Sequence, residues 1–179
     1  MTPTGVARMA AYNRWMNERL FEAAGRLPPQ ELTADRGAFF GSILGTLNHL
    51  AVADTLWLHR FAQQRPPFVT LAALSAFPRP GTLRDTLADD LPTLGALREQ
   101  LDSLILRWAD ELSAERLASN LSYANMAGAP MVKNLGALVQ HFFNHQTHHR
   151  GQASTLLFQA GVDIGVTDLL TLIPNAPSR

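Results

Sequence analysis

Four segments of the chain repeat apolar residues at spacings of three and four, which is the period of an amphipathic α-helix. We expect helices over residues 6–26, 39–64, 82–112 and 132–160. No segment shows the sustained alternation of apolar and polar residues that strands of a hairpin require. Because each helix must bury its apolar stripe against the others, the pattern predicts an all-α fold, a four-helix bundle.

Prolines mark the connections between these segments. Pro28–Pro29 ends the first helix, and Pro66–Pro67 ends the second. Residues 65–82 contain four prolines, which indicates a long crossover in place of a tight helical hairpin. We expect the third helix to begin with Thr82 as its cap and to kink or restart at Pro92.

The segment between the third and fourth helices is rich in turn-forming residues. It reads LASNLSYANMAGAPMVKN over residues 117–134, and we expect a short irregular hairpin or loop there. A length of 179 residues, 46% of them hydrophobic, is enough for one substantial core. We therefore expect residues 1–179 to form a single domain.

The charge balance and the lack of cysteine exclude several kinds of partner and site. Lys+Arg and Asp+Glu number 15 each, so no net positive charge favours nucleic acid or an acidic membrane. No apolar run reaches the roughly 20 residues that span a bilayer, and the N-terminal residues do not read as a signal peptide, so we expect a cytoplasmic protein. Without cysteine, a metal ion would be held by His, Asp, Glu or carbonyl oxygen.

Residues 141–152, HFFNHQTHHRGQ, hold four of the six histidines within the fourth expected helix. On a helical wheel, His149 falls inside the apolar stripe and His145 at its near edge. These two residues are four apart, so they project from one face on successive turns and can reach one ion. His141 and His148 lie towards the polar side, and we expect them at the rim.

A third ligand must come from another helix. The segment NHLAVADTLWLHRF in the second expected helix offers His49, Asp54 and His59. His59 points least towards the apolar face, whereas His49 lies at its margin and Asp54 lies inside it. Helical spacing leaves both His49 and Asp54 open as the third ligand.

Two common metal motifs are absent. The metalloprotease pattern requires Glu directly after the first His, and Gln146 occupies that position. Ferritin-like sites require Glu-x-x-His pairs, which these helices lack. Peptide hydrolysis and di-iron oxidation therefore lose support.

Other residues near the histidines have two interpretations each. Arg150 lies off the ligand face of its helix, which favours a salt bridge or a dimer contact over substrate binding. Four polar residues could orient an imidazole or serve ordinary helix packing and capping, namely Asn48, Asp54, Asn144 and Gln152. Three aromatic residues could line a pocket or belong to the core, namely Trp15, Trp57 and Tyr123.

Three stretches together resemble the DinB/YfiT-like family, and the resemblance covers essentially the whole chain. They are YNRWMNERL, NHLAVADTLWL and HFFNHQTHHRGQASTLLFQAG. In this family one histidine of the second helix and two of the fourth bind a divalent metal, which implies His49, His145 and His149 as the ligands. The resemblance also implies an up-down-down-up four-helix bundle, frequent homodimers and a site that opens into a pocket.

The same family includes bacillithiol and mycothiol S-transferases and a thiol-dependent isomerase. Three neutral imidazoles leave a dication an open position, where bound water or thiol becomes acidic. Because the chain lacks cysteine, the thiol would be a small molecule. We therefore expect a metal-dependent thiol S-transferase or hydrolase, with no catalytic side chain assigned.

Other metals and other functions remain open. We expect zinc, with nickel, iron or copper as alternatives. The alternative function is a non-catalytic metal-binding protein of the stress response, in which Asp54 or His148 closes the coordination sphere. A third possibility is a metal-free bundle whose histidines bond to one another.

Overall fold

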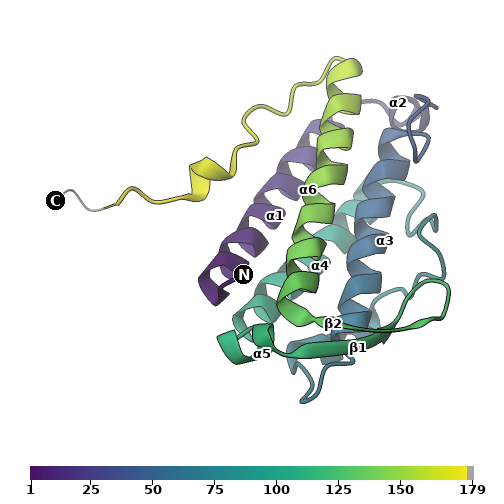
Figure 1. The fold of residues 1–179 in the computed structure, drawn as a ribbon. Coiled ribbons are helices and arrows are strands. Elements are labelled where there is room, and N and C mark those ends of the chain that lie inside the picture. Colours follow the sequence, from purple (N-terminus) through teal and green to yellow (C-terminus); the bar gives the residue numbers. More distant parts are fainter. Residues whose placement is uncertain (177–179) are drawn as a thin grey trace.

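The structure, a computed structural model, describes residues 1–176 and is mostly helical. Four long helices lie side by side (Figure 1). The first, α1, contacts α4 and α6, and α3 contacts the same two helices. The helical prediction is confirmed, with these bounds for the long helices: α1 Pro3–Ala24, α3 Ile43–Phe61, α4 Leu91–Asp110 and α6 Leu135–Gln159.

Short elements connect the long helices. The segment between the third and fourth helices, expected as a short hairpin or loop, is a hairpin whose antiparallel strands pair Asn120 with Asn134. A further segment, η2, follows α6 and contacts α1. The short elements are α2 Pro29–Thr33, η1 Thr70–Ala76, α5 Ala114–Ala118, β1 Asn120–Ala124, β2 Pro130–Asn134 and η2 Leu169–Leu172.

The start of α4 differs from the prediction. The helix begins at Leu91, where the Asp90 carboxylate accepts the N–H of Thr93 at 2.8 Å. Pro92 lies in the first turn, where a missing N–H costs nothing, so it opens the helix and does not kink it. Thr82 is not a helix cap, because its hydroxyl donates to Asp85 in a turn of the connection.

The other long helices also begin or end away from the predicted bounds. The second expected helix starts at Ile43, because Ser42 caps it and Gly41 before it has a φ of 75°. The last helix starts at Leu135, because the residues before it pair as β2 and Asn134 accepts the N–H of Ala137.

The core lies between the four long helices. Phe61 of α3 stacks on Trp108 of α4, with 4.8 Å between ring centroids, and Phe142 of α6 meets both rings edge-on. All three side chains are buried. Among residues 1–176, no helix combines the length and apolar character needed to cross a bilayer.

Candidate metal centre

The packing of α3 against α6 brings three histidines together. His49 of α3 and His145 and His149 of α6 each offer a ring nitrogen, and these atoms all lie within 4.8 Å of one another. His49 is buried, and the other two are half-buried. No second group of His, Cys, Asp or Glu in the described part of the chain meets this condition. We call these three residues the histidine group.

Hydrogen bonds fix the ring orientation of two of these histidines. Nδ1 of His49 donates to the carbonyl of Leu83 at 3.0 Å, and Nδ1 of His149 donates to Oε1 of Gln152 at 2.7 Å. A neutral imidazole that donates from Nδ1 keeps the lone pair on Nε2. Both Nε2 atoms are therefore in the form that can bind a metal ion.

Buried nitrogens in the histidine group have no protein partner. Nε2 of His49 and Nδ1 of His145 are both buried. Within residues 1–176, neither atom has a hydrogen-bond partner. A buried polar atom without a partner is costly, so such atoms call for a bound ligand. A divalent metal ion, for which imidazole is a common ligand, fits this donor set.

The surroundings keep these imidazoles neutral. Burial lowers the pKa of His49 to about 4 and that of His145 to about 3, and a proton on His149 would lower both further. Burial also lowers the pKa of His149. Metal binding requires the deprotonated imidazole, so the three rings are ready to bind near neutral pH.

Two further contacts position His49, one from the segment just before α3 and one from the connection between α3 and α4. The ring of Phe40 stacks on His49, with 3.8 Å between centroids and 17° between planes. Asn48 accepts the N–H groups of Leu87 and Ala88 and so holds the connection that carries Leu83 against α3. The sequence suggested Asn48 as a group that orients an imidazole, but no local signal pointed to Phe40 or to the Leu83 carbonyl.

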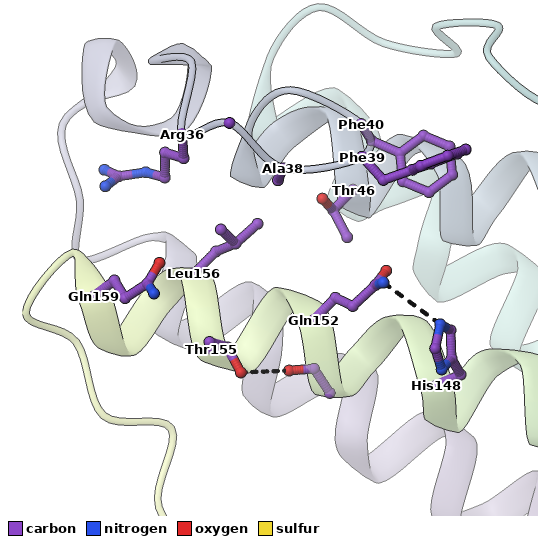
Figure 2. A pocket seen from close by; sticks show the side chains of 12 residues that line it. Arg36, Ala38, Phe39, Phe40, Thr46, His148, Gln152, Thr155, Leu156 and Gln159 are labelled. Atoms are coloured by element: carbon purple, nitrogen blue, oxygen red, sulfur yellow. Dashed lines mark hydrogen bonds between the residues drawn. The ribbon is translucent and has the colours of Figure 1, made fainter.

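Next to two residues that contact the histidine group is a cavity of about 480 Å³, and Figure 2 shows the side chains that line it. The three histidines themselves are not among its lining residues. The cavity lies between α6 and the segment that precedes α3. Phe40, which stacks on His49, and Gln152, which binds His149, both line it. The volume is within the range of small-molecule sites. A molecule in this cavity would thus contact the residues that support two of the three histidines.

The remaining histidines do not join the histidine group. His141 and His148 are exposed, as predicted, although the ring of His148 lies 4.9 Å from that of His149. His59 is half-buried and lies elsewhere on α3. Asp54 is fully buried but binds Arg98, so it is not the third member that the sequence left open.

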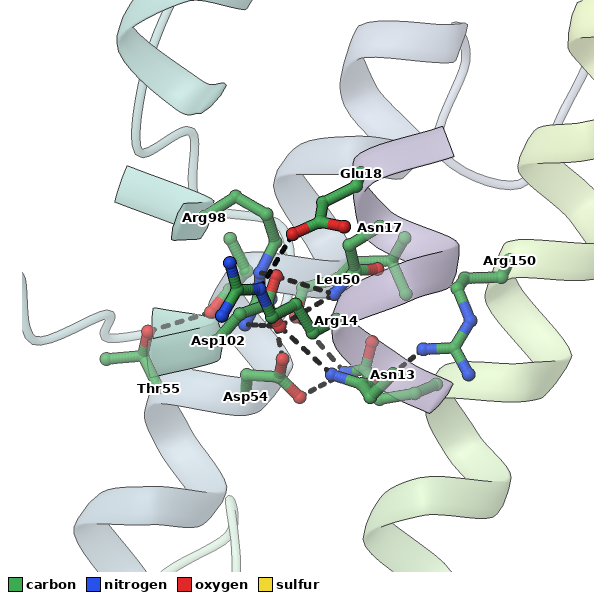
Figure 3. Close-up of polar contacts among 12 residues, drawn as sticks. Asn13, Arg14, Asn17, Glu18, Leu50, Asp54, Thr55, Arg98, Asp102 and Arg150 are labelled. Carbon is green, nitrogen blue, oxygen red and sulfur yellow. Dashed lines mark hydrogen bonds and ion pairs between the residues drawn. The ribbon is translucent and has the colours of Figure 1, made fainter. Parts of the chain in front are cut away.

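Asp54 instead belongs to a set of polar residues in the centre of the fold (Figure 3). Nη1 of Arg98 lies 2.6 Å from the Asp54 carboxylate, and Nη2 lies 3.0 Å from Asp102. All members are buried, and they come from all four long helices. We call them the buried polar network: Asn13, Asn17, Asp54, Arg98, Asp102, Gln146 and Arg150.

Two residues of the buried polar network lie on α6, and their roles differ from those that the sequence suggested. In the sequence, Gln146 showed only that the catalytic Glu of the metalloprotease motif is absent. In the structure, Gln146 donates a hydrogen bond to Asp54. The expected salt bridge or dimer contact of Arg150 is wrong. This residue is 2% exposed, donates to Asn13 and lies over the ring of Tyr12. Among the described residues Arg150 forms no ion pair, since the nearby carboxylates already face Arg98.

The network predicts a pH effect on stability. Burial raises the pKa of Asp54 from 3.8 to about 6, although the charge of Arg98 acts to lower it. Between about pH 4 and pH 6 the folded protein therefore binds more protons at Asp54 than the unfolded chain. The contribution of Asp54 to the free energy of unfolding is largest at low pH and decreases as pH rises through this window.

Urea unfolding of the wild type and of Asp54→Asn measures this contribution. Other titrating groups act on both proteins, so the difference between them isolates Asp54. We expect the difference to favour the wild type most near pH 4 and to shrink towards pH 7. A difference that stays constant, or that grows with pH, contradicts the raised pKa.

The Gln152 contact predicts a change in metal affinity. Gln152→Ala removes the acceptor that fixes His149, and losing such a partner typically weakens metal binding by about 10–100-fold. Gln159→Ala is the matched control, because Gln159 lines the same cavity from the same helix without touching a histidine of the group. Competition with a zinc chelator measures the zinc affinity of both variants. Equal affinity of Gln152→Ala and Gln159→Ala contradicts the prediction.

Two comparisons with known proteins extend over this site. The sequence model of the DinB family matches residues 1–177. Among curated proteins, the chain is similar to Protein DinB of Bacillus subtilis (strain 168), with 25% identity over 174 residues. This match covers 90% of the chain and 89% of that protein. The family match includes both helices that carry the histidine group.

Proposed function

This chain belongs to the DinB family, and we propose that His49, His145 and His149 bind one divalent metal ion for catalysis. The reaction that we infer is transfer of a small thiol, through its sulfur, to an electrophile. One observation carries the proposal: three ring nitrogens lie within 4.8 Å of one another, and residues that contact two of these histidines line a cavity of about 480 Å³.

The ligand set favours a catalytic site over a structural one. Structural zinc sites in proteins are closed by four protein ligands, whereas catalytic sites keep one position open. In the described residues neither Asp54 nor His148 joins the three histidines. Phe40 and Gln152, which contact His49 and His149, also line this cavity, although the three histidines do not. These contacts support an open position that a substrate can reach.

The residues of the chain have the following tasks in this proposal. Leu83 and Gln152 fix the tautomers of His49 and His149. Phe40 shields the ring of His49 from water by stacking on it. When bound, the dication would supply a Lewis acid that lowers the pKa of a thiol. Histidine ligation suits zinc, which we expect, and also nickel or iron.

The thiol must come from outside the chain, which contains no cysteine. In the transfer, the thiol loses its proton to solvent and its sulfur forms a bond to carbon of the electrophile. The leaving group departs with the electron pair of the broken bond. The chain contributes binding, orientation and exclusion of water.

Rates with a panel of low-molecular-weight thiols and monochlorobimane test the reaction. We expect zinc-loaded wild type to accelerate conjugation of at least one thiol and His149→Ala to lose this acceleration. Equal rates for both proteins contradict the transferase proposal. A protein that binds zinc but accelerates no thiol supports the alternative, a non-catalytic metal-binding role.

The family membership also supports a specific topology and assembly. We infer that the long helices form the up-down-down-up four-helix bundle and that two copies form a homodimer. Light scattering after size exclusion measures the assembly. A molar mass of one chain at working concentration contradicts the dimer.

A further inference from the structure

A second cavity, of about 250 Å³, lies on another part of α3. It is bounded by α3, by residues 79–81 of the connection and by residues 124–126 at the turn of the hairpin. Its charged or titratable lining residues are His59, Arg60 and Arg79, and no Asp or Glu lines it. The cavity is therefore basic, although the whole chain has no net charge.

Within residues 1–176, the two arginines of this cavity, Arg60 and Arg79, have no acidic partner. The guanidinium of Arg60 lies over the rings of Trp57 and Tyr123, 4.7 and 5.5 Å from their centroids. These rings hold the guanidinium in place without neutralising it, so it can still pair with an anion.

His59 also lines this cavity. Nε2 of His59 is buried and has no hydrogen-bond partner within the described residues. Burial lowers the pKa of His59, and the charge of Arg79 acts in the same direction. A neutral imidazole can donate one hydrogen bond from a ring nitrogen.

The loop that carries Arg79 is restrained. Pro78 and Pro80 flank it and fix their own backbone φ angles. The Asp85 carboxylate accepts the N–H of Gly81 at 2.7 Å, which braces the loop from outside the cavity. A restrained loop loses less entropy when it binds a ligand.

We propose that Arg60, Arg79 and His59 bind an oxyanion, the phosphate or carboxylate group of a small molecule, in this cavity. Two guanidinium groups and one ring N–H provide the donors that such a group accepts. The site is separate from the histidine group, because His59 lies ten residues after His49 on α3, or about 15 Å along the helix axis.

Calorimetric titration with glycerol 3-phosphate and with succinate tests the proposal, with glycerol as the neutral control. A metal ion would itself bind anions, so each titration is made on wild type and on His145→Ala. We expect saturable binding of at least one anion by both proteins and none of glycerol. Tighter binding of glycerol 3-phosphate assigns the site to phosphate esters, and tighter binding of succinate assigns it to carboxylates.

Three variants locate the binding. Arg79→Gln changes an exposed side chain, so we expect it to fold like the wild type and to weaken binding about tenfold or more. Arg60→Gln should do the same, although it also loses the contact with Trp57. Arg107→Gln removes an exposed arginine of α4 that does not line the cavity, and it should bind like the wild type.

Two results would overturn the proposal: no saturable binding of either anion by the wild type, or unchanged affinity in Arg79→Gln and Arg60→Gln. Zinc content is measured in the same proteins. If the anion binds to His145→Ala while zinc does not, the two sites are independent. Failure of anion binding with zinc retained contradicts this inference alone and leaves the proposed metal site intact.

Discussion

Replacing His145 or His149 by alanine is expected to abolish stoichiometric binding of zinc or nickel, whereas His59→Ala and His148→Ala bind metal like the wild type. His145 and His149 each supply one of only three ring nitrogens that converge. Loss of a residue that only hydrogen-bonds to a metal ligand lowers metal affinity by about 10–100-fold. Loss of a ligand itself should therefore lower it by at least about 100-fold. His49→Ala should have the same effect, because no other residue of α3 joins the group.

Metal analysis of untagged protein after incubation with zinc or nickel, followed by dialysis, measures this effect. Circular dichroism of each variant shows whether it folds, which separates a lost ligand from a lost structure. Less than about a tenth of an equivalent in the wild type ends the metal hypothesis. Loss of metal in His59→Ala or His148→Ala, with retention in His145→Ala, would show that the ligands are assigned incorrectly.

Replacing Arg98 by methionine is expected to lower the free energy of unfolding by about 3–5 kcal/mol. Arg98 is 2% exposed and lies between the buried carboxylates of Asp54 and Asp102. Without its guanidinium, two buried carboxylates lose their common ion-pair partner. Removing one partner of a buried ion pair lowers stability because it leaves the other charge buried without compensation. Replacing all the charged residues by apolar ones can leave stability unchanged.

Urea denaturation measures this loss. Arg14→Met is the control, because Arg14 forms an exposed ion pair with Glu18 in the same orientation along its helix, and exposed pairs contribute little. Adding Asp54→Leu and Asp102→Leu to Arg98→Met removes the uncompensated charges and should restore much of the stability. A loss for Arg98→Met no larger than that for Arg14→Met contradicts the role of the buried polar network.

The predicted helices and their errors have a common physical basis. Apolar periodicity reports which face of a segment is buried, and it located all four long helices. Helix ends depend on single hydrogen bonds, and periodicity does not report them. Leu83 and Leu87 continued the apolar pattern of α4 in the sequence, yet Asp90 caps the helix after them and Asn48 binds the preceding segment.

The site shows the same division. The pairing of His145 with His149 follows from a spacing of four residues on one helix, which is a local property. The choice between His49 and Asp54 was not local, because both lie near the apolar face of α3. The packing of α3 decided it: Asp54 faces Arg98 of α4, whereas His49 faces α6.

The sequence by itself determined the helical class, the inward histidine pair of α6 and the lack of any thiolate in the chain. Helical spacing left His49 and Asp54 open as the partner of that pair, and the family resemblance implied His49. Only the tertiary structure shows how a nitrogen from a helix about 100 residues earlier meets the pair, while Asp54 binds Arg98. It also supplied Phe40 and the Leu83 carbonyl, and it placed Gln146 and Arg150 in the buried polar network. Apart from the contact of Phe40, which lies nine residues before His49, these contacts join segments 34 or more residues apart. They depend on how the chain packs and leave no periodic pattern along the sequence.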